Sequence, residues 1–271
     1  MNGASREALA AARERLDALT DNTSVDAGRL ADELAAVTAL LDREVSLRRV
    51  LTDPAQAGEA KAELAQRLLG GQVGGETADL LAGMVRSRWS QSRDLVDALE
   101  ELADTADLTA AQKAGTLDDV EDELFRFGRI VSSSTELRAA LTDRAATTSA
   151  KSELLRSLLG GRAKATTERL VTRLVTAPRG RSLESGLESL SRLAAERRQR
   201  LVAVVTTAVP LSDAQRRRLG AALGKLYGHT MHLNIDVDPE VVGGIRVQVG
   251  DEVINGSLAD RIEDAGRRLA S

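Results

Sequence analysis

The chain has 271 residues, a length typical of two domains, and 42% of them are hydrophobic, enough to bury a core. It contains no cysteine, which excludes disulfides and thiolate-bound metals and is typical of a reducing compartment. The formal net charge is −4, and the longest run without a charged residue, Leu201–Ser212, is too short to span a bilayer. With Arg6 and Glu7 near its start, the chain is expected to carry no signal peptide and to be soluble.

The charge is unevenly distributed. Residues 1–150 carry 17 basic and 27 acidic side chains, whereas residues 151–227 carry 16 basic and 6 acidic ones. The basic segment could face nucleic acid, an acidic protein, or the acidic part of its own chain. A helical nucleic-acid-associated protein using residues 151–227 therefore stays an alternative, although the chain has only 1% aromatic residues to stack on bases.

From the N-terminus to about residue 200 the apolar residues follow a helical period. The patterns predict helices at about 5–20, 28–45, 58–69, 75–88, 92–113, 117–133, 148–159, 164–176 and 181–200. A short segment ending in Leu-Thr-Asp follows the second and the sixth of these helices, where Thr52-Asp53 and Thr142-Asp143 can stop one helix and start the next turn.

These helices belong to an internal repeat with an offset of 90 residues. "AKAELAQRLLGG" at 60–71 recurs as "AKSELLRSLLGG" at 150–161, and residues 32–85 match residues 122–175 at 20 of 54 positions without a gap. The apolar stripe of the first copy is matched position by position in the second, which predicts a shared buried face. The paired stripes are Leu30, Leu34, Val37, Leu40 and Leu41 in the first copy, and Val120, Leu124, Phe127, Ile130 and Val131 in the second.

Two glycine pairs, Gly70-Gly71 and Gly160-Gly161, close equivalent helices in the two copies. Neither pair is followed by the Lys-Ser/Thr of a phosphate loop. We therefore interpret them as helix C-caps in the left-handed conformation that glycine adopts easily.

The pattern changes from residue 201 onward. "LVAVVTTAV" predicts a buried strand that ends at Pro210, and Ser212-Asp213 can cap a following helix. Alternating residues at 233–237 and 245–249 predict half-buried strands, with a short strand at Val253-Ile254 and a last helix from Ser257 to about Leu269. The fold class is therefore mainly α, with tandem antiparallel helical bundles at 1–110 and 111–200 followed by a small α/β domain at 201–271.

The sequence predicts no catalytic, cofactor-binding or metal site. His229 and His232 are three residues apart at a strand entrance, which directs them to opposite faces, and no third ligand is near them in the sequence. Gly243-Gly244 lacks both a helix start and a lysine, so tight turning explains it better than phosphate binding. Every acidic cluster falls on a helix face that we expect to be solvated.

The segment "LNIDVDPEVVGGIRVQVGDEVINGSLADRIEDA" resembles the C-terminal signature of the delta subunit of bacterial F-type ATP synthases, the OSCP family. "VVTTAVPLSDAQRRRLGAAL" resembles the strand-Pro-helix segment of the same family, and residues from about 92 resemble its helical domain. The first 90 or so residues depart from the usual length and are explained by the duplication, and the Ala/Arg-rich usage is similar to that of actinobacterial members. The signature turn residues are Asp238, Pro239, Gly243, Gly244, Gly250 and Gly256.

The resemblance implies a non-catalytic subunit of the stator. In this family the helical domain holds the N-terminal helix of an alpha subunit of the catalytic head, and the C-terminal domain holds the b subunits of the peripheral stalk. The implied location is the cytoplasmic face of the cell membrane, as a peripheral part of the complex. No cofactor, no nucleic acid and no direct membrane insertion are implied.

Overall fold

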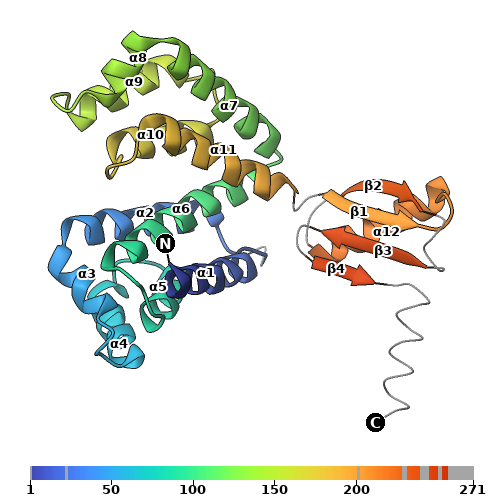
Figure 1. Ribbon diagram of the computed structural model, residues 1–271, viewed down its shortest axis with the longest axis horizontal. Coiled ribbons are helices and arrows are strands. Elements are labelled where there is room, and N and C mark those ends of the chain that lie inside the picture. The colour runs from blue at the N-terminus through green and yellow to red at the C-terminus, as the bar shows by residue number, and fades with distance from the viewer. Residues whose placement is uncertain are drawn as a thin grey trace. The chain divides into compact units, whose positions relative to one another are not determined.

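The computed structural model describes residues 2–21, 24–199, 202–227, 231–238, 244–249 and 252–255. Within these residues the chain divides into two compact units, residues 1–194 and 195–271 (Figure 1). In the described residues the first unit is helical, and the second contains a four-stranded sheet and the helix that connects its first two strands. This arrangement confirms the fold class expected from the sequence.

The predicted helices of the first 200 residues begin and end within a few residues of their expected positions, and the two segments that end in Leu-Thr-Asp form the additional short helices α3 and α8. Their bounds are α1 Gly3–Asp21, α2 Ala27–Arg43, α3 Val45–Thr52, α4 Gly58–Leu69, α5 Gly75–Arg86, α6 Ser92–Lys113, α7 Leu117–Ser133, α8 Thr135–Thr142, α9 Thr148–Leu159, α10 Ala165–Thr176 and α11 Leu183–Gln199. Both Leu-Thr-Asp segments end a short helix. Thr52 and Thr142 donate their hydroxyl groups to carbonyls one turn back, at 2.9 and 2.7 Å.

The repeat in the sequence is also a repeat of structure. Helices α2 to α5 correspond to α7 to α10, and α6 is shared, since it follows the first set and precedes the second. It packs against α1, α2 and α3 as well as against α7 and α10. Because both of its sides are covered, α6 is buried along most of its length, whereas an ordinary surface helix buries one stripe. We refer to α2–α5 as the first repeat and to α7–α10 as the second.

A hydrogen-bonded contact recurs at the offset of 90 residues. Glu33 on α2 accepts hydrogen bonds from the backbone N–H of Gly74, at 2.8 Å, and from the Thr77 hydroxyl, at 2.6 Å. In the second repeat Glu123 accepts from the N–H of Lys164 and from the Thr167 hydroxyl, at 2.9 and 2.5 Å. One carboxylate therefore joins α2 to the start of α5, and its equivalent joins α7 to the start of α10, where free N–H groups and the helix dipole favour a negative charge.

The second unit is a mixed sheet with the strand order β2-β1-β3-β4. Its strands are β1 Val202–Thr207, β2 His232–Val237, β3 Ile245–Val249 and β4 Glu252–Asn255, and α12, Asp213–Tyr227, connects β1 to β2. β1 pairs in parallel with β2 and antiparallel with β3, placing Ala203 opposite Val249 and Val205 opposite Val247. These four side chains are buried together with Leu223 of α12. Alternate residues of β3 form the core face, as predicted, but β1 was expected to be buried throughout and instead alternates as well, with Val204 39% exposed.

The predicted helix cap at Ser212 is present. The Ser212 hydroxyl accepts a hydrogen bond from the Gln215 N–H at 3.3 Å, and the Gln215 side chain accepts one from the Ser212 N–H at 2.8 Å. This reciprocal pair satisfies two N–H groups at the start of α12. The expected last helix from Ser257 lies outside the described residues.

Candidate partner-binding surfaces

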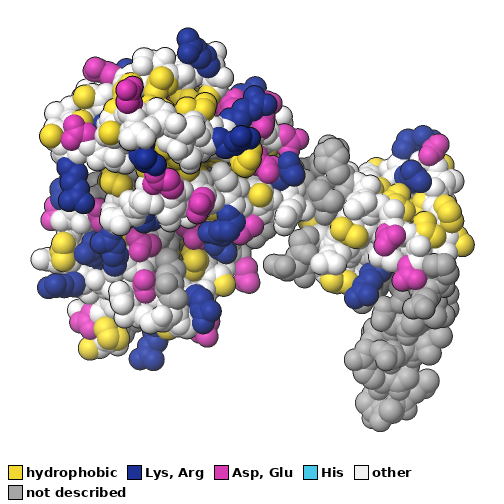
Figure 2. All heavy atoms as spheres, turned by 45° about the horizontal axis from the view of Figure 1, so that its top comes forward, with side chains coloured by type: hydrophobic (Ala, Val, Ile, Leu, Met, Phe, Trp, Pro, Cys, Tyr) yellow, Lys and Arg dark blue, Asp and Glu magenta, His cyan; other side chains and the backbone are white. Residues whose placement is uncertain are grey.

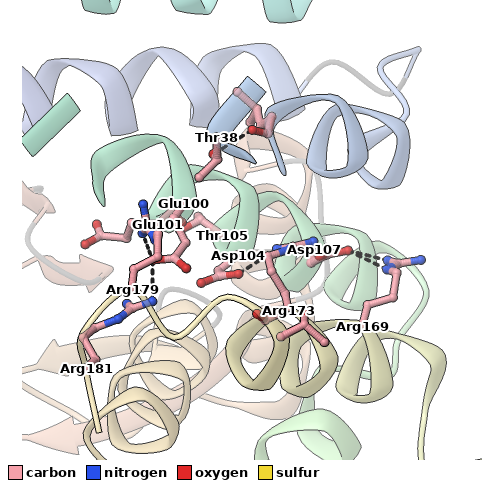
Figure 3. Close-up of polar contacts among 12 residues, drawn as sticks. Thr38, Glu100, Glu101, Asp104, Thr105, Asp107, Arg169, Arg173, Arg179 and Arg181 are labelled. Carbon is pink, nitrogen blue, oxygen red and sulfur yellow. Dashed lines mark hydrogen bonds and ion pairs between the residues drawn. The ribbon is translucent and has the colours of Figure 1, made fainter. Parts of the chain in front are cut away.

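An acidic cluster on α6 lies inside the helical unit and not on a solvated face. Glu100, Asp104 and Asp107 are 4%, 8% and 0% exposed, so the expectation that every acidic cluster is solvated was wrong. Figure 3 shows arginines of α10 and of the α10–α11 connection converging on these carboxylates. A buried carboxylate needs such partners, because burial without compensation costs several kcal/mol.

The ion pairs join α6 to the second repeat. Arg173 binds Asp104 and Asp107, each at 2.7 Å, and Arg169 binds Asp107 as well. Arg179, which is 4% exposed, pairs with Glu100, to which Arg181 adds a contact of 2.6 Å. Desolvation raises the pKa of Asp104 to about 7, although Arg173 opposes that change. The cluster attaches the second repeat to the shared helix.

These ion pairs account for part of the uneven charge distribution. Four arginines of the basic segment 151–227 face the acidic part of the same chain, which was one of the three alternatives drawn from the sequence. Their charge is therefore neutralised internally and is not displayed for nucleic acid.

The second repeat exposes apolar surface that the stripe pattern did not predict. Phe125 and Ile130 of α7 are 58% and 53% exposed, so the expected burial of Ile130 was wrong. The other four members of this stripe, Val120, Leu124, Phe127 and Val131, are at most 5% exposed. Positions 125 and 130 lie on either side of that buried stripe.

Two of the six signature residues, Asp238 and Gly244, lie in the described part of the sheet unit. The N–H of Asp238 donates to the Thr207 carbonyl at 2.9 Å, which continues the β1–β2 pairing past β2. Gly244 precedes β3 with φ of +93°, a conformation that favours glycine. Pro239, Gly243, Gly250 and Gly256 lie outside the described residues.

The glycine pairs end their helices, but mostly not in the predicted way. Gly161 is left-handed, with φ of +70°, whereas Gly70 is right-handed at −61° and Gly160 has φ of −56°. A Cβ added to Gly70 or Gly160 would lie 2.5 Å from the carbonyl oxygen four residues earlier. Close approach of the backbone to that oxygen, and not the sign of φ, is what requires glycine at these two positions.

The described part of the chain was also searched for a metal site and for a membrane-spanning helix. No group of three His, Asp or Glu side chains there is arranged to hold a metal ion. His229 lies outside the described residues, and His232 begins β2. Among the described helices, none combines the length and the apolar character that a membrane span requires.

Sequence reasoning missed the carboxylate contacts of both repeats. A signal was present, because Glu33 and Thr77 are among the 20 positions that are identical at the offset of 90 residues. Identical polar residues on helices that bury only one face indicate a shared hydrogen bond. The ion pairs of α6 left no comparable signal, since Arg169 and Arg173 replace Asp79 and Gly83 of the first repeat.

Comparison with known proteins identifies the family. Residues 105–269 match the family model described as ATP synthase delta (OSCP) subunit. ATP synthase subunit delta of Streptomyces coelicolor is 84% identical over 271 residues, covering 100% of this chain and 99% of the relative. The protein of the same name from Thermobifida fusca is 49% identical over 270 residues, with 100% of both chains covered.

A chain in the structure of the Toxoplasma gondii mitochondrial ATP synthase hexamer matches 62% of this chain and 95% of its own length, with 22% identity and a TM-score of 0.33. The family model begins inside α6 and so leaves the whole first repeat unmatched, whereas the two actinobacterial relatives match the chain from end to end. With the family model covering more than half of its residues, and with relatives this similar, the chain belongs to the ATP synthase delta (OSCP) subunit family.

Proposed function

We propose that this chain is a non-catalytic stator subunit of the F-type proton-translocating ATP synthase, linking the catalytic head to the peripheral stalk. The observation that carries the proposal is the family membership of a chain that folds as two separate compact units. Two units can hold two partners that do not touch each other. A link of this kind needs binding surfaces and no reaction centre.

The partners follow from the family resemblance. The helical unit would hold the N-terminal helix of an alpha subunit, because helix bundles bind amphipathic helices in the grooves between their own helices. The sheet unit would hold the stalk b subunits. Such a subunit would be a peripheral part of the complex at the cytoplasmic face of the membrane.

The alternative, a nucleic-acid-associated protein, gains no support from the structure. Arg169, Arg173 and Arg179 of the basic segment are engaged by carboxylates of α6, so these side chains are not available to the phosphates of a nucleic-acid strand. The segment also contributes a single aromatic residue, Tyr227, whose hydroxyl donates to Glu252 at 2.9 Å.

Rebinding to stripped membranes tests the proposal. Membranes depleted of this chain would be supplied with the full chain or with residues 1–200, and the detergent-solubilised head would be isolated. With the full chain, the b subunits are expected to co-purify with the head. With residues 1–200, we expect the fragment to stay on the head and the b subunits to be lost. Recovery of equal b subunit with both forms would contradict the assignment of the sheet unit.

A further inference from the structure

A cavity of about 500 Å³ lies between α6, α10 and α11 of the helical unit. Its lining is rich in charged side chains and contains no aromatic one. Four carboxylates line it, and the arginines outnumber them: Arg93, Arg173, Arg179, Arg181 and Arg192. A cavity of this volume can hold a small ligand together with water.

The turn that places Arg179 in the lining has an unusual backbone. The N–H of Arg181 donates to the Pro178 carbonyl at 3.0 Å, and the two residues between them, Arg179 and Gly180, have φ of +46° and +84°. Positive φ at both central residues is typical of a type I′ turn, which prefers glycine, asparagine and aspartate. Among the described residues, Arg179 is the only one other than glycine with positive φ. Its backbone is therefore strained, and such strain is concentrated at functional sites.

The guanidinium group of Arg179 is buried, and part of it lacks an acceptor. The side chain is 4% exposed, and Nη2 pairs with Glu100 and lies 3.4 Å from Asp97. Nε and Nη1 are buried and have no hydrogen-bond partner in the described part of the chain. A buried donor without an acceptor costs stability, so these N–H groups indicate a ligand that accepts hydrogen bonds.

The equivalent connection after the first repeat, between α5 and α6, is built differently. It buries Trp89, whose indole N–H donates to the Met84 carbonyl at 2.8 Å. Of the two connections, as far as the structure describes them, only the one between α10 and α11 contains buried side-chain N–H groups without an acceptor. The duplication of the helices therefore does not extend to this feature.

Two further arginines lie next to Arg179. Arg93 of α6 donates to the Arg179 carbonyl and has no ion pair among the described residues. Arg181, 37% exposed, binds Glu100 at 2.6 Å beside Arg179, as Figure 3 shows. Guanidinium groups that come from α6 and from the turn can donate to different oxygens of one anion, and such charge-assisted hydrogen bonds are the strong ones.

The carboxylates of the cavity do not cancel this positive charge. Glu100 and Asp104 bind arginines of the lining, and Glu101 binds Arg13 of α1 at 2.7 Å. Burial raises the pKa of Asp104 to about 7 and also raises the pKa of Asp97, so protons neutralise part of the negative charge near neutral pH. An anion that enters the cavity therefore meets more positive than negative charge.

We propose that the cavity between α6, α10 and α11 binds a compact tetrahedral oxyanion, inorganic phosphate, through Arg93, Arg179 and Arg181. Its oxygens supply the acceptors that Nε and Nη1 of Arg179 lack, and its double negative charge suits a site where arginines exceed carboxylates. A nucleotide fits less well, because the lining offers no aromatic face for a base. The inference goes beyond the proposed function and can be tested on the isolated full chain.

The outer surface of the helical unit is not expected to bind phosphate strongly. Figure 2 shows Lys and Arg side chains next to Asp and Glu side chains on its visible face. Exposed charges of both signs, screened by salt, attract a small anion only weakly. Saturable binding of phosphate would therefore report the cavity and not the general surface charge.

Thermal unfolding of the full chain in phosphate, sulfate and chloride at equal ionic strength tests the site. Phosphate and sulfate should raise the unfolding temperature along a saturating curve, with half of the effect at about 1 mM, and chloride should not. Both oxyanions also stabilise proteins because they are excluded from the surface, but that effect rises without saturating. Equilibrium dialysis with radiolabelled phosphate should give one bound phosphate per chain.

Arginine variants locate the bound ion. Arg93→Gln keeps an N–H group for the Arg179 carbonyl but removes the charge, and Arg179→Gln removes the unbonded donors. Each should weaken phosphate binding by about tenfold or more, as expected for the loss of a charge-assisted contact. Arg88→Gln, exposed in the connection between α5 and α6, is the matched control and should bind phosphate as the unmodified chain does. Circular dichroism would check the helical content, and Arg93→Gln decides if Arg179→Gln does not fold.

Three results would overturn the proposal. The first is a stabilisation by phosphate that does not saturate, and the second is dialysis without bound phosphate. The third is phosphate binding by Arg93→Gln that equals that of the unmodified chain. None of these results bears on the proposed function, which is tested separately by rebinding to stripped membranes.

Discussion

Leu34 and Leu124 occupy equivalent positions of α2 and α7, and both side chains are 0% exposed. Equal burial in the two repeats is what the paired apolar stripes predicted. Leu34→Ala and Leu124→Ala should each lower the free energy of unfolding by about 2 to 5 kcal/mol, the usual cost of a cavity in a packed core. Urea unfolding followed by circular dichroism measures it. Leu68→Ala, at a position that is 44% exposed, should cost much less.

The repeated carboxylate contact allows a second test at the residue scale. Partial burial raises the pKa of Glu33, but hydrogen bonds from Thr77, Arg29 and Gly74 outweigh this effect, and the pKa lies below its ordinary value. Glu33→Gln should therefore lower the unfolding free energy by about 1 to 3 kcal/mol, the range for a hydrogen bond to a charged group. A double-mutant cycle with Thr77→Val should show coupling between the two positions, and additive effects would contradict the contact.

Residues that lie beside a stripe are where prediction from the sequence failed. Ile130 is part of the helical stripe by spacing, yet it is 53% exposed, at the edge of the stripe on the side away from Phe125. Whether a neighbouring helix covers a position depends on how two helices pack, which the period of one helix does not contain. The burial of Asp107 could not be predicted for the same reason. Its carboxylate forms ion pairs with Arg169 and Arg173, which belong to α10, a different helix.

Among the helices, α6 is unusual because it packs against helices of both repeats. Its buried carboxylates are accepted because arginines of α10 and the following connection lie within ion-pair distance. The pKa of Asp104, raised to about 7 by desolvation, lies above the unfolded value of 3.8. The folded chain therefore binds more protons than the unfolded chain between those two pH values. The contribution of Asp104 to stability is full below about pH 4 and is lost as the pH rises through about 7.

Asp104→Asn removes this titration. The unfolding free energy of the unmodified chain should fall more steeply between pH 4 and pH 7 than that of the variant, because only the unmodified chain must release the proton of Asp104. Thermal or urea unfolding across this range gives the two slopes. Identical slopes would contradict the assignment of the raised pKa to this carboxyl group.

The positions of most helices could be predicted closely from the sequence. The bounds of α4, α6, α7 and α9 agree with the expected ranges because caps, glycines and Leu-Thr-Asp segments act locally and are visible in the sequence. The sharing of α6 by the two repeats depends on its contacts with α7 and α10 as well as with α1, α2 and α3, which the period of a single helix does not contain. Capping residues and glycines in the sequence indicate where a helix ends, but they do not indicate which other helices it packs against.

At the scale of the whole molecule, the chain should bind no nucleotide tightly. Its glycine pairs lack the lysine and hydroxyl that hold phosphate and magnesium in a phosphate loop, and Gly70 and Gly160 instead allow a close backbone approach. Calorimetric titration of the isolated chain with ATP should give no heat of binding in the micromolar range. A micromolar dissociation constant would require a site that neither the sequence nor the described fold contains.

Under the proposed function, one unit of the chain would hold the head and the other would hold the stalk, so that the head could not turn with the rotor. Nanomolar binding corresponds to about 12 kcal/mol, and two separate surfaces allow the chain to hold both partners without direct contact between them. The most direct measurement is ATP-driven proton pumping in membrane vesicles whose only copy of this chain is residues 1–200. ATP hydrolysis by the head is expected to continue while pumping collapses, and the full chain supplied in the same vesicles should restore it. Full pumping with residues 1–200 alone would contradict the account.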